Sequence, residues 1–400
     1  MLGDHFRFVL PDRHGQASKA IVWLIGFFAF LNVYSMQAVL PLVMRDFHAS
    51  PLQAGATVGA TVLAVALVSP FMGMLSDALG RKVVLCVSLF GLTLPTALIP
   101  AAASLHLVVV LRFCQGLFIP GIVVSFMAYI AEEFSFDAVA RITGIYIGGT
   151  VMGGFSGRFI TGHASHLFGW RGAFLSLAAL NLAGAALTVW LLPASRHFVA
   201  RRDARSALRA LAHHLHNQRL LAACAVGFFV LFSLVGTFTY VNLLLTDAPF
   251  KLTVAGLANV FCVYLVGVVV TPLAGRFMVR LGFRRALLCA LAMSSAGLLL
   301  TLLPVLAIVI FGLTICSSGV FICQTAAISF IAESVSEGRS LATGLYYMSY
   351  YAGGAAGTWI AGLAYEGWGW DGSVGSLIVG QMLAATIAWF AWRRPAANAS

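Results

Sequence analysis

Apolar runs long enough to cross a lipid bilayer as α-helices recur along the whole chain. A transmembrane helix needs roughly 20 predominantly apolar residues, and these runs match that length. Transmembrane β-strands do not explain them, because barrel strands alternate apolar and polar residues over about ten positions and these runs do not. The runs predict an all-α membrane protein with twelve transmembrane helices, which we place at residues 20–43, 54–75, 83–101, 106–131, 141–163, 171–192, 220–246, 254–278, 285–303, 306–332, 340–364 and 374–392.

The composition excludes the soluble and disordered classes of protein. Of the 400 residues, 60% are hydrophobic and 9% are charged, whereas soluble domains carry roughly 25% charged residues and disordered chains are rich in charge. The seven cysteines lie in apolar runs without paired spacing, so we expect neither disulfides nor a zinc site. The spans contain no cluster of His, Cys or carboxylates, and the chain has no nucleotide-binding loop. We therefore expect no metal, no cofactor and no enzymatic activity.

The basic residues predict the orientation in the membrane. Most of the 24 lysines and arginines fall on one side of the predicted helices, and only Arg45, Arg171 and Lys251 fall on the other. By the positive-inside rule, both termini are then cytoplasmic in a multi-pass protein of the inner (plasma) membrane. The net charge of +11 is a topology signal with some attraction to anionic lipid, and does not indicate nucleic-acid binding. The first run is too long for a signal peptide, so we expect it to be the first helix of the mature protein.

The two halves of the chain are copies of one another. When residues 143–172 are shifted by 200 positions, twelve of these thirty residues meet identical ones, including Gly153, Gly157 and Trp170. Two six-helix halves of equal orientation predict a pseudo-two-fold axis along the membrane normal and a central cavity. The predicted domains are a cytoplasmic tail (1–19), a first half (20–192), a cytoplasmic linker (193–219), a second half (220–392) and a second cytoplasmic tail (393–400).

Residues 73–82, after the second predicted helix, read G-M-L-S-D-A-L-G-R-K. This segment resembles the loop signature of the major facilitator superfamily, G-x-L-x-D-x-x-G-R-K, and its second copy at 275–285 keeps the glycines and basic residues but has lost the acid. The glycines allow a tight turn, the acid can accept bonds from a helix N-terminus, and the arginine can pair with a carboxylate. Such contacts would hold the cytoplasmic side shut, whereas the alternative is an ordinary turn with positive-inside charges. The predicted gating residues here are Gly73, Asp77, Gly80, Arg81, Lys82 and Glu132.

The fourth predicted helix contains Arg112 and, three residues on, Gln115 on the same face. The stretch Arg112-Phe-Cys-Gln115-Gly116 resembles the R-x-x-Q-G signature of proton-coupled members of the superfamily. A guanidinium inside the membrane costs several kcal/mol unless it is paired or hydrated, so by default it indicates a cavity or a relay. The alternative is a structural arginine bonded to backbone carbonyls.

Three glycines of the fifth predicted helix, Gly149, Gly153 and Gly157, form a stripe of small residues that lets another helix approach closely. The stretch resembles the antiporter signature G-x-x-x-G-P-x-x-G-G, but Gly154 replaces the proline and Arg158 replaces the last glycine. The resemblance implies a gating role for the stripe, and pure packing is the alternative.

Arg158 lies at a depth similar to that of Arg112, and its counterpart in the second half is Thr358. Two membrane arginines without an acid at that depth suggest either an anionic substrate or a relay through hydroxyls. All thirteen acids map to loops or helix ends, so the nearest candidates to carry a coupling proton, besides Arg112, are Asp46 and Asp247. The alternative for both acids is a helix cap or a solvated helix end.

Further polar and aromatic residues lie on helices that line the pore in this superfamily. The predicted substrate-binding set is Asn32, Tyr34, Gln37, Arg112, Gln115, Arg158, Tyr240, Asn242, Gln324, Tyr346 and Tyr350. Aromatic rings with a few amides suit a broad amphipathic solute.

The resemblance extends along essentially the whole chain. Within the superfamily, Gly-Gly-x-x-Gly-Arg at 153–158 and Tyr-x-Met-Gln-x-x-Leu-Pro at 34–41 are similar to the YnfM-like (acriflavine-sensitivity) branch. This implies a monomeric, proton-driven efflux carrier for drugs or other small organic solutes that works by alternating access. One alternative is a carrier of an anionic metabolite, an organic acid or a sugar derivative, clamped by Arg112 and Arg158. A membrane-embedded enzyme or a channel is the remote alternative, opposed by the absence of clustered catalytic groups and by the internal repeat.

Overall fold

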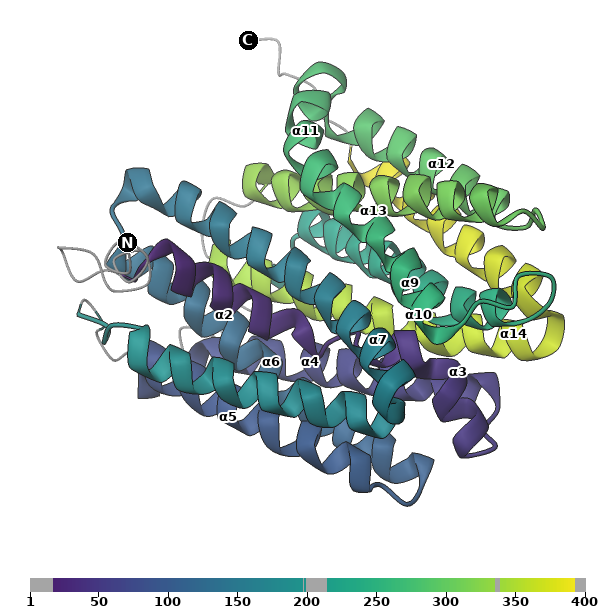
Figure 1. Ribbon diagram of the computed structural model, residues 1–400. Coiled ribbons are helices and arrows are strands. Elements are labelled where there is room, and N and C mark those ends of the chain that lie inside the picture. The colour runs from purple at the N-terminus through teal and green to yellow at the C-terminus, as the bar shows by residue number, and fades with distance from the viewer. Residues whose placement is uncertain (1–16, 197, 199–213, 335–338, 393–400) are drawn as a thin grey trace, which may run out of the picture. The chain divides into compact units, whose positions relative to one another are not determined.

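A computed structural model describes residues 17–196, 198, 214–334 and 339–392 (Figure 1). Within these ranges every regular element is a helix, which confirms the predicted all-α class. Ten helices in the described residues are long and apolar enough to cross a membrane. Residues 1–16 of the first predicted tail, all of the second predicted tail and most of the predicted linker lie outside the described residues.

The contacts divide the chain into two units: Met1–Arg202 with Leu252–Cys262, and Asp203–Lys251 with Val263–Ser400. The helices of the first unit are α2 (Lys19–Leu31), α3 (Met36–Asp46), α4 (Pro51–Leu79), α5 (Arg81–Leu98), η1 (Ile99–Ala101), α6 (Leu105–Glu133), α7 (Phe136–Leu191) and α10 (Val254–Val260). Those of the second are α9 (Gln218–Thr246), α11 (Val266–Leu281), α12 (Phe283–Leu300), α13 (Leu306–Ser334) and α14 (Arg339–Ala391), and η2 (Phe261–Leu265) spans the division.

Two helices are about twice as long as a single span, and each is interrupted by a glycine. In α7, Gly169 has φ +69°, and in α14, Gly369 has φ +63°. A residue with a Cβ is strained in this region of backbone conformation, so glycine ends one helical stretch and starts the next. With these interruptions the described helices accommodate twelve spans, although the count itself stays a prediction.

The first predicted span is not one continuous helix. Residues 32–35 break it into α2 and α3, and the hydroxyl of Ser35 donates to the carbonyl of Asn32 (3.1 Å) within the break. Asn and Ser side chains compete with helical hydrogen bonds in this way. The break leaves backbone carbonyls that need other donors, and this decides where the candidate site forms.

The predicted glycine stripe packs α7 directly onto α2. A Cβ added to Gly149, Gly153 or Gly157 would overlap the carbonyl oxygens of successive turns of α2, at Trp23, Phe27 and Leu31. The second unit repeats the arrangement, since Gly353 and Gly357 of α14 meet the carbonyl oxygens of Phe228 and Phe232 on α9. The prediction that small residues let these helices approach closely is confirmed.

Candidate functional site

The side chain of Arg112, two turns from the start of α6, is fully buried in the first unit. Its Nε donates to the carbonyl of Thr57 (3.0 Å), one terminal nitrogen donates to the carbonyl of Asn32 (2.8 Å), and the other donates to the carbonyl of Val33 (2.8 Å). The side-chain oxygen of Gln115 accepts a fourth bond (2.6 Å). None of the salt bridges among the described residues involves Arg112.

The break in the first span explains this geometry. The carbonyls of Asn32 and Val33 lie in the break, and a guanidinium offers five N–H donors in a fixed fork. Arg112 therefore holds the broken helix in place while the broken helix solvates the charge. These are the bonds expected of a structural arginine that binds backbone carbonyls. The roles of Arg112 in substrate binding and proton coupling stay predictions.

The hydrogen bonds continue from Arg112 through amides and a hydroxyl. Gln115 donates to the hydroxyl of Thr96 (2.7 Å), Asn181 donates to the same hydroxyl (3.4 Å), and Asn32 donates to the side-chain oxygen of Asn181 (2.8 Å). All of these side chains are buried. We call Asn32, Thr96, Arg112, Gln115 and Asn181 the Arg112 network.

Sequence reasoning missed two members of the Arg112 network, Thr96 and Asn181. Asn181 is an amide inside an otherwise apolar run, and its counterpart 200 residues on, Gln381, is also an amide. This agreement between the copies is the signal that would have found it. The buried side-chain oxygen of Asn32 has no hydrogen-bond partner in the described part of the chain, so it can still accept from a water or a ligand.

Arg158 forms a second buried cationic site in the first unit. Its Nε donates to the side-chain oxygen of Gln37 (2.7 Å), and a terminal nitrogen donates to the carbonyl of Gly154 (2.7 Å). Its guanidinium carbon lies 4.6 Å from the centre of the Tyr34 ring and 5.0 Å from that of the Phe261 ring. Aromatic faces attract a cation at these distances, most strongly where water is excluded. The structure thus brings the predicted residues Tyr34, Gln37 and Arg158 together, and adds Phe261, which no sequence signal singled out.

The second unit contains a neutral counterpart of the Arg112 network. Gln381 donates to the hydroxyls of Ser233 (2.5 Å) and Ser294 (2.9 Å), and Ser294 lies 3.4 Å from the sulfur of Cys316. These residues occupy equivalent places, because shifts of 200 or 201 positions relate Asn181 to Gln381, Asn32 to Ser233 and Gln115 to Cys316. The same shift relates Arg112 to Leu313, so the charge is present in one copy only.

The remaining predicted binding residues lie in the second unit. The hydroxyl of Tyr240 donates to the carbonyl of Thr358 (2.6 Å), and the amide of Asn242 donates to its own helix at Phe238 (2.8 Å). The buried rings of Tyr346 and Tyr350 stack with their centres 5.7 Å apart. Gln324 of α13 is partly exposed.

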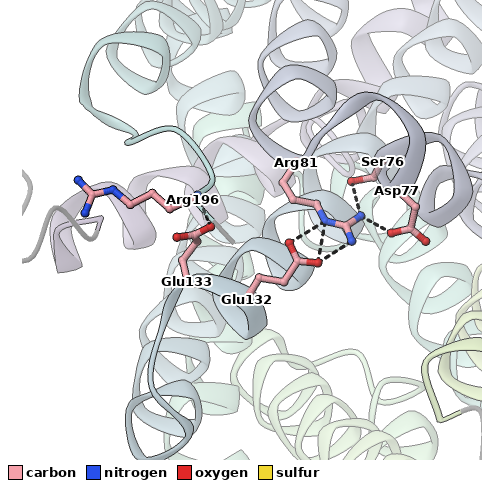
Figure 2. Close-up of polar contacts among 6 residues, drawn as sticks. All are labelled: Ser76, Asp77, Arg81, Glu132, Glu133 and Arg196. Atoms are coloured by element: carbon pink, nitrogen blue, oxygen red, sulfur yellow. Dashed lines mark hydrogen bonds and ion pairs between the residues drawn. The ribbon is translucent and has the colours of Figure 1, made fainter. Parts of the chain in front are cut away.

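The predicted gating residues meet where α4 ends and α5 begins. Figure 2 shows Arg81 held between Asp77 (2.5 Å) and Glu132 (2.7 Å), and its guanidinium also donates to the hydroxyl of Ser76 (3.1 Å). The predicted pairing of Arg81 with Glu132 is therefore present. Gly80 turns the chain with φ +102°, a conformation that side chains with a Cβ rarely adopt.

Further contacts surround the turn between α4 and α5, and some of them were not predicted. The ammonium of Lys82 donates to the carbonyls of Val189 (3.1 Å) and Leu192 at the end of α7. Glu133 accepts a bond from the backbone N–H of Arg196 (2.6 Å), the residue drawn beside it in Figure 2. Gly73, the first residue of the signature, lies near Val124 of α6. The loop signature thus ties together the ends of α4, α5, α6 and α7.

Asp46 lies at the opposite end of the first unit and is ion-paired. Its carboxylate binds the guanidinium of Arg171 and accepts a bond from the indole N–H of Trp170 (3.2 Å). Arg171 also donates to the carbonyl of Pro100 (3.1 Å). Asp46 therefore links α3 to the middle of α7, beside the interruption at Gly169, and Arg171 extends the link to η1. The predicted part of Asp46 in proton coupling would require this ion pair to open.

Comparison with known proteins matches the chain to one family of membrane transporters over most of its length. The family model described as Major Facilitator Superfamily matches residues 22–263 and 250–400. The inner membrane transport protein YnfM of Escherichia coli is 30% identical over 364 residues, which are 90% of this chain and 87% of that protein. The MFS-type transporter YybF of Bacillus subtilis is 29% identical over 353 residues, which are 88% and 87% of the two chains.

A solved structure shares the fold, and two further relatives match about half of the chain. The structure of a bacterial homologue of the human lysosomal transporter Spinster has a TM-score of 0.78 at 16% identity and covers 93% of this chain and 96% of its own. The multidrug resistance protein MdtG of Proteus mirabilis is 26% identical over 51% of this chain and 52% of its own. A gallate transporter of Pseudomonas putida is 28% identical over 48% of this chain and 43% of its own.

Proposed function

The chain belongs to the major facilitator superfamily, and from this premise we propose that it exports small organic solutes, drugs or metabolites, in exchange for protons. It is a multi-pass membrane transporter, and its relatives are transporters and not enzymes. The proposal places it in the inner membrane, as the name of YnfM supports, with the Arg81 end of the first unit in the cytoplasm.

The helix break at residues 32–35 is the observation that carries the proposal. Discontinuous helices in secondary transporters form the substrate and ion sites near the bilayer midplane. Here Asn32 and Tyr34 lie within the break, Gln37 follows it, and Arg112 binds its carbonyls. A ligand that forms hydrogen bonds with these groups competes with the bonds between Arg112 and the carbonyls of the break, and these bonds hold the break in its present form. We therefore place ligand binding and helix movement at the same point.

The cluster around Arg81 supports alternating access. Three groups of α4 and α6 bind one guanidinium, so movement of either helix end breaks several charge-assisted bonds together. A contact of this kind is made in one state and lost in another, as a gate requires. The name of the relative MdtG supports drugs as one class of solute, and the resemblance of Arg112 and Gln115 to the proton-coupled signature supports the coupling ion.

The test is transport by purified protein in liposomes with an imposed pH gradient. Substrates are first found by thermal stabilisation across cationic, neutral and anionic compounds, and the hits are then followed across the membrane. We expect movement of a hit to follow the pH gradient and to fall at least tenfold in Asn32→Ala, with Thr386→Val, an exposed residue of α14, as the control. Movement at equal rates without any ion gradient would remove proton coupling from the proposal.

A second candidate function is the carriage of an anionic organic solute. The buried guanidinium of Arg158 between Tyr34 and Phe261 favours it, and so does the name of the gallate transporter, because an aromatic carboxylate can pair with the cation and stack on the rings. Stabilisation by anionic compounds that is lost in Arg158→Gln but kept in Thr358→Val, the equivalent position of the second unit, would favour this candidate over the first.

A further inference from the structure

Four arginines lie within ten residues where α11 ends and α12 begins: Arg276, Arg280, Arg284 and Arg285. Arg276, Arg280 and Arg285 are exposed, and Arg284 is partly exposed. No acidic residue occurs anywhere in α11 or α12. We call this segment, residues 276–285, the arginine loop.

The first copy of the same segment shows what the arginine loop lacks. There, Arg81 is neutralised by Asp77 and Glu132. The residue equivalent to Asp77, shifted by 202 positions, is Val279, whose side chain is 89% exposed. The residue equivalent to Glu132 is Glu333, which is exposed and forms no salt bridge with any described arginine. The loop therefore carries four positive charges that no carboxylate in the described chain compensates.

Apolar surface adjoins this charge. Leu273, Phe277 and Leu281 of α11 are all exposed, and so is Trp389 of α14, whose ring lies 4.9 Å from the guanidinium carbon of Arg284. In a protein that spans the membrane, exposed apolar side chains of the spans face lipid tails, and arginines at the helix ends reach the headgroups. A ligand that fits both parts has an anionic group above and hydrocarbon below.

We propose that the arginine loop binds the headgroup phosphate of an anionic phospholipid, whose acyl chains lie along the exposed apolar side chains of α11. Guanidinium groups bind phosphate through paired, charge-assisted hydrogen bonds. A zwitterionic headgroup carries its own ammonium, which the four arginines repel, so the uncompensated charge selects lipids of net negative charge. Free inorganic phosphate shares the anionic chemistry but lacks the hydrocarbon, and this difference separates the two sources.

The experiment measures retention of phosphatidylglycerol and phosphatidylcholine by the full-length protein in detergent, with native mass spectrometry as the readout. We expect phosphatidylglycerol to be retained at least fivefold more than phosphatidylcholine. Replacement of Arg280, Arg284 and Arg285 together by Gln should abolish that preference. Equal retention of the two lipids by the wild-type protein, or an unchanged preference in the triple variant, would overturn the proposal.

Val279→Asp keeps the proposal testable if the triple variant fails to fold. It restores the acid of the first copy at a side chain that is 89% exposed, so packing is unaffected, and we expect the lipid preference to fall severalfold. The control is Val83→Asp, which adds the same charge at the start of α5, where the side chain is 55% exposed. If the lipid preference falls equally in both variants, the effect depends on net charge alone, and the proposal that the arginine loop is a specific site is overturned. Full displacement of the lipid by millimolar inorganic phosphate would assign the loop to soluble phosphate instead.

Discussion

Arg112→Met is the substitution that separates the structural role of this arginine from a role in transport. It keeps most of the length of the side chain and removes every donor. The carbonyl of Val33 and the side-chain oxygen of Gln115 then lose their donor inside a site that is fully buried. The carbonyl of Asn32 keeps the bond from the hydroxyl of Ser35, and that of Thr57 keeps its helical partner in α4. If the guanidinium holds the helix break in place, the protein without it is less stable even when no substrate is present.

The structure sets the size of the effect. A buried oxygen acceptor without a donor costs about 1–3 kcal/mol, so the carbonyl of Val33 and the side-chain oxygen of Gln115 together cost about 2–6 kcal/mol. Against this, the substitution removes the desolvation penalty of a buried charge, which is also several kcal/mol. We expect a net loss of about 1–3 kcal/mol in the free energy of unfolding. The stability of Arg112→Lys should fall between that of the wild-type protein and that of Arg112→Met, because an ammonium keeps the charge but lacks the planar fork.

The assay is unfolding of the purified protein in mixed micelles by increasing amounts of sodium dodecyl sulfate, followed by circular dichroism. The control is Leu313→Met, which places the same residue at the equivalent buried position of the second unit and should cost less than about 1.5 kcal/mol. Wild-type stability of Arg112→Met together with lost transport would refute the structural reasoning and assign the arginine to the transport cycle.

Three further predictions follow from contacts of the first unit. Gly153→Ala should destabilise the protein by about 1–3 kcal/mol, because the new Cβ overlaps the backbone of α2. Gly148→Ala, on the same helix with open space beside it, should instead stabilise the protein by up to about 1 kcal/mol. The two variants should therefore shift the unfolding midpoint in opposite directions. Glu132→Gln leaves Arg81 with Asp77 and should cost about 1 kcal/mol, since Glu132 is 29% exposed; the loss should shrink in high salt when unfolding is repeated at 1 M sodium chloride. Asp46→Asn should lower stability by less than about 1 kcal/mol, because the pair with Arg171 is half-exposed, yet abolish proton-driven transport in liposomes; unchanged coupling would exclude Asp46 as the proton carrier.

The sequence predicted the helical class, the glycine-mediated packing and the pairing of Arg81 with Glu132, because each depends on a short pattern. Glycines spaced four residues apart determine which face of α7 carries small residues, and this holds for any helix that packs against that face. The break at residues 32–35 was not predicted, because an apolar run with two small polar residues is also compatible with a continuous helix. The residue that indicates the break is Arg112, 80 residues after Asn32, because its buried N–H donors need free carbonyls as partners.

The two copies within the chain provide a comparison that strengthens this account of Arg112. In the first unit an arginine faces a broken helix, and α2 and α3 stand where one helix was expected. In the second unit the equivalent helix, α9, continues without interruption from Gln218 to Thr246, and the position equivalent to Arg112 holds leucine. A buried hydrogen-bonded cluster around one amide is present in both units, centred on Asn181 in the first and on Gln381 in the second. The break and the arginine are present together in one copy and absent together in the other, as expected if each requires the other.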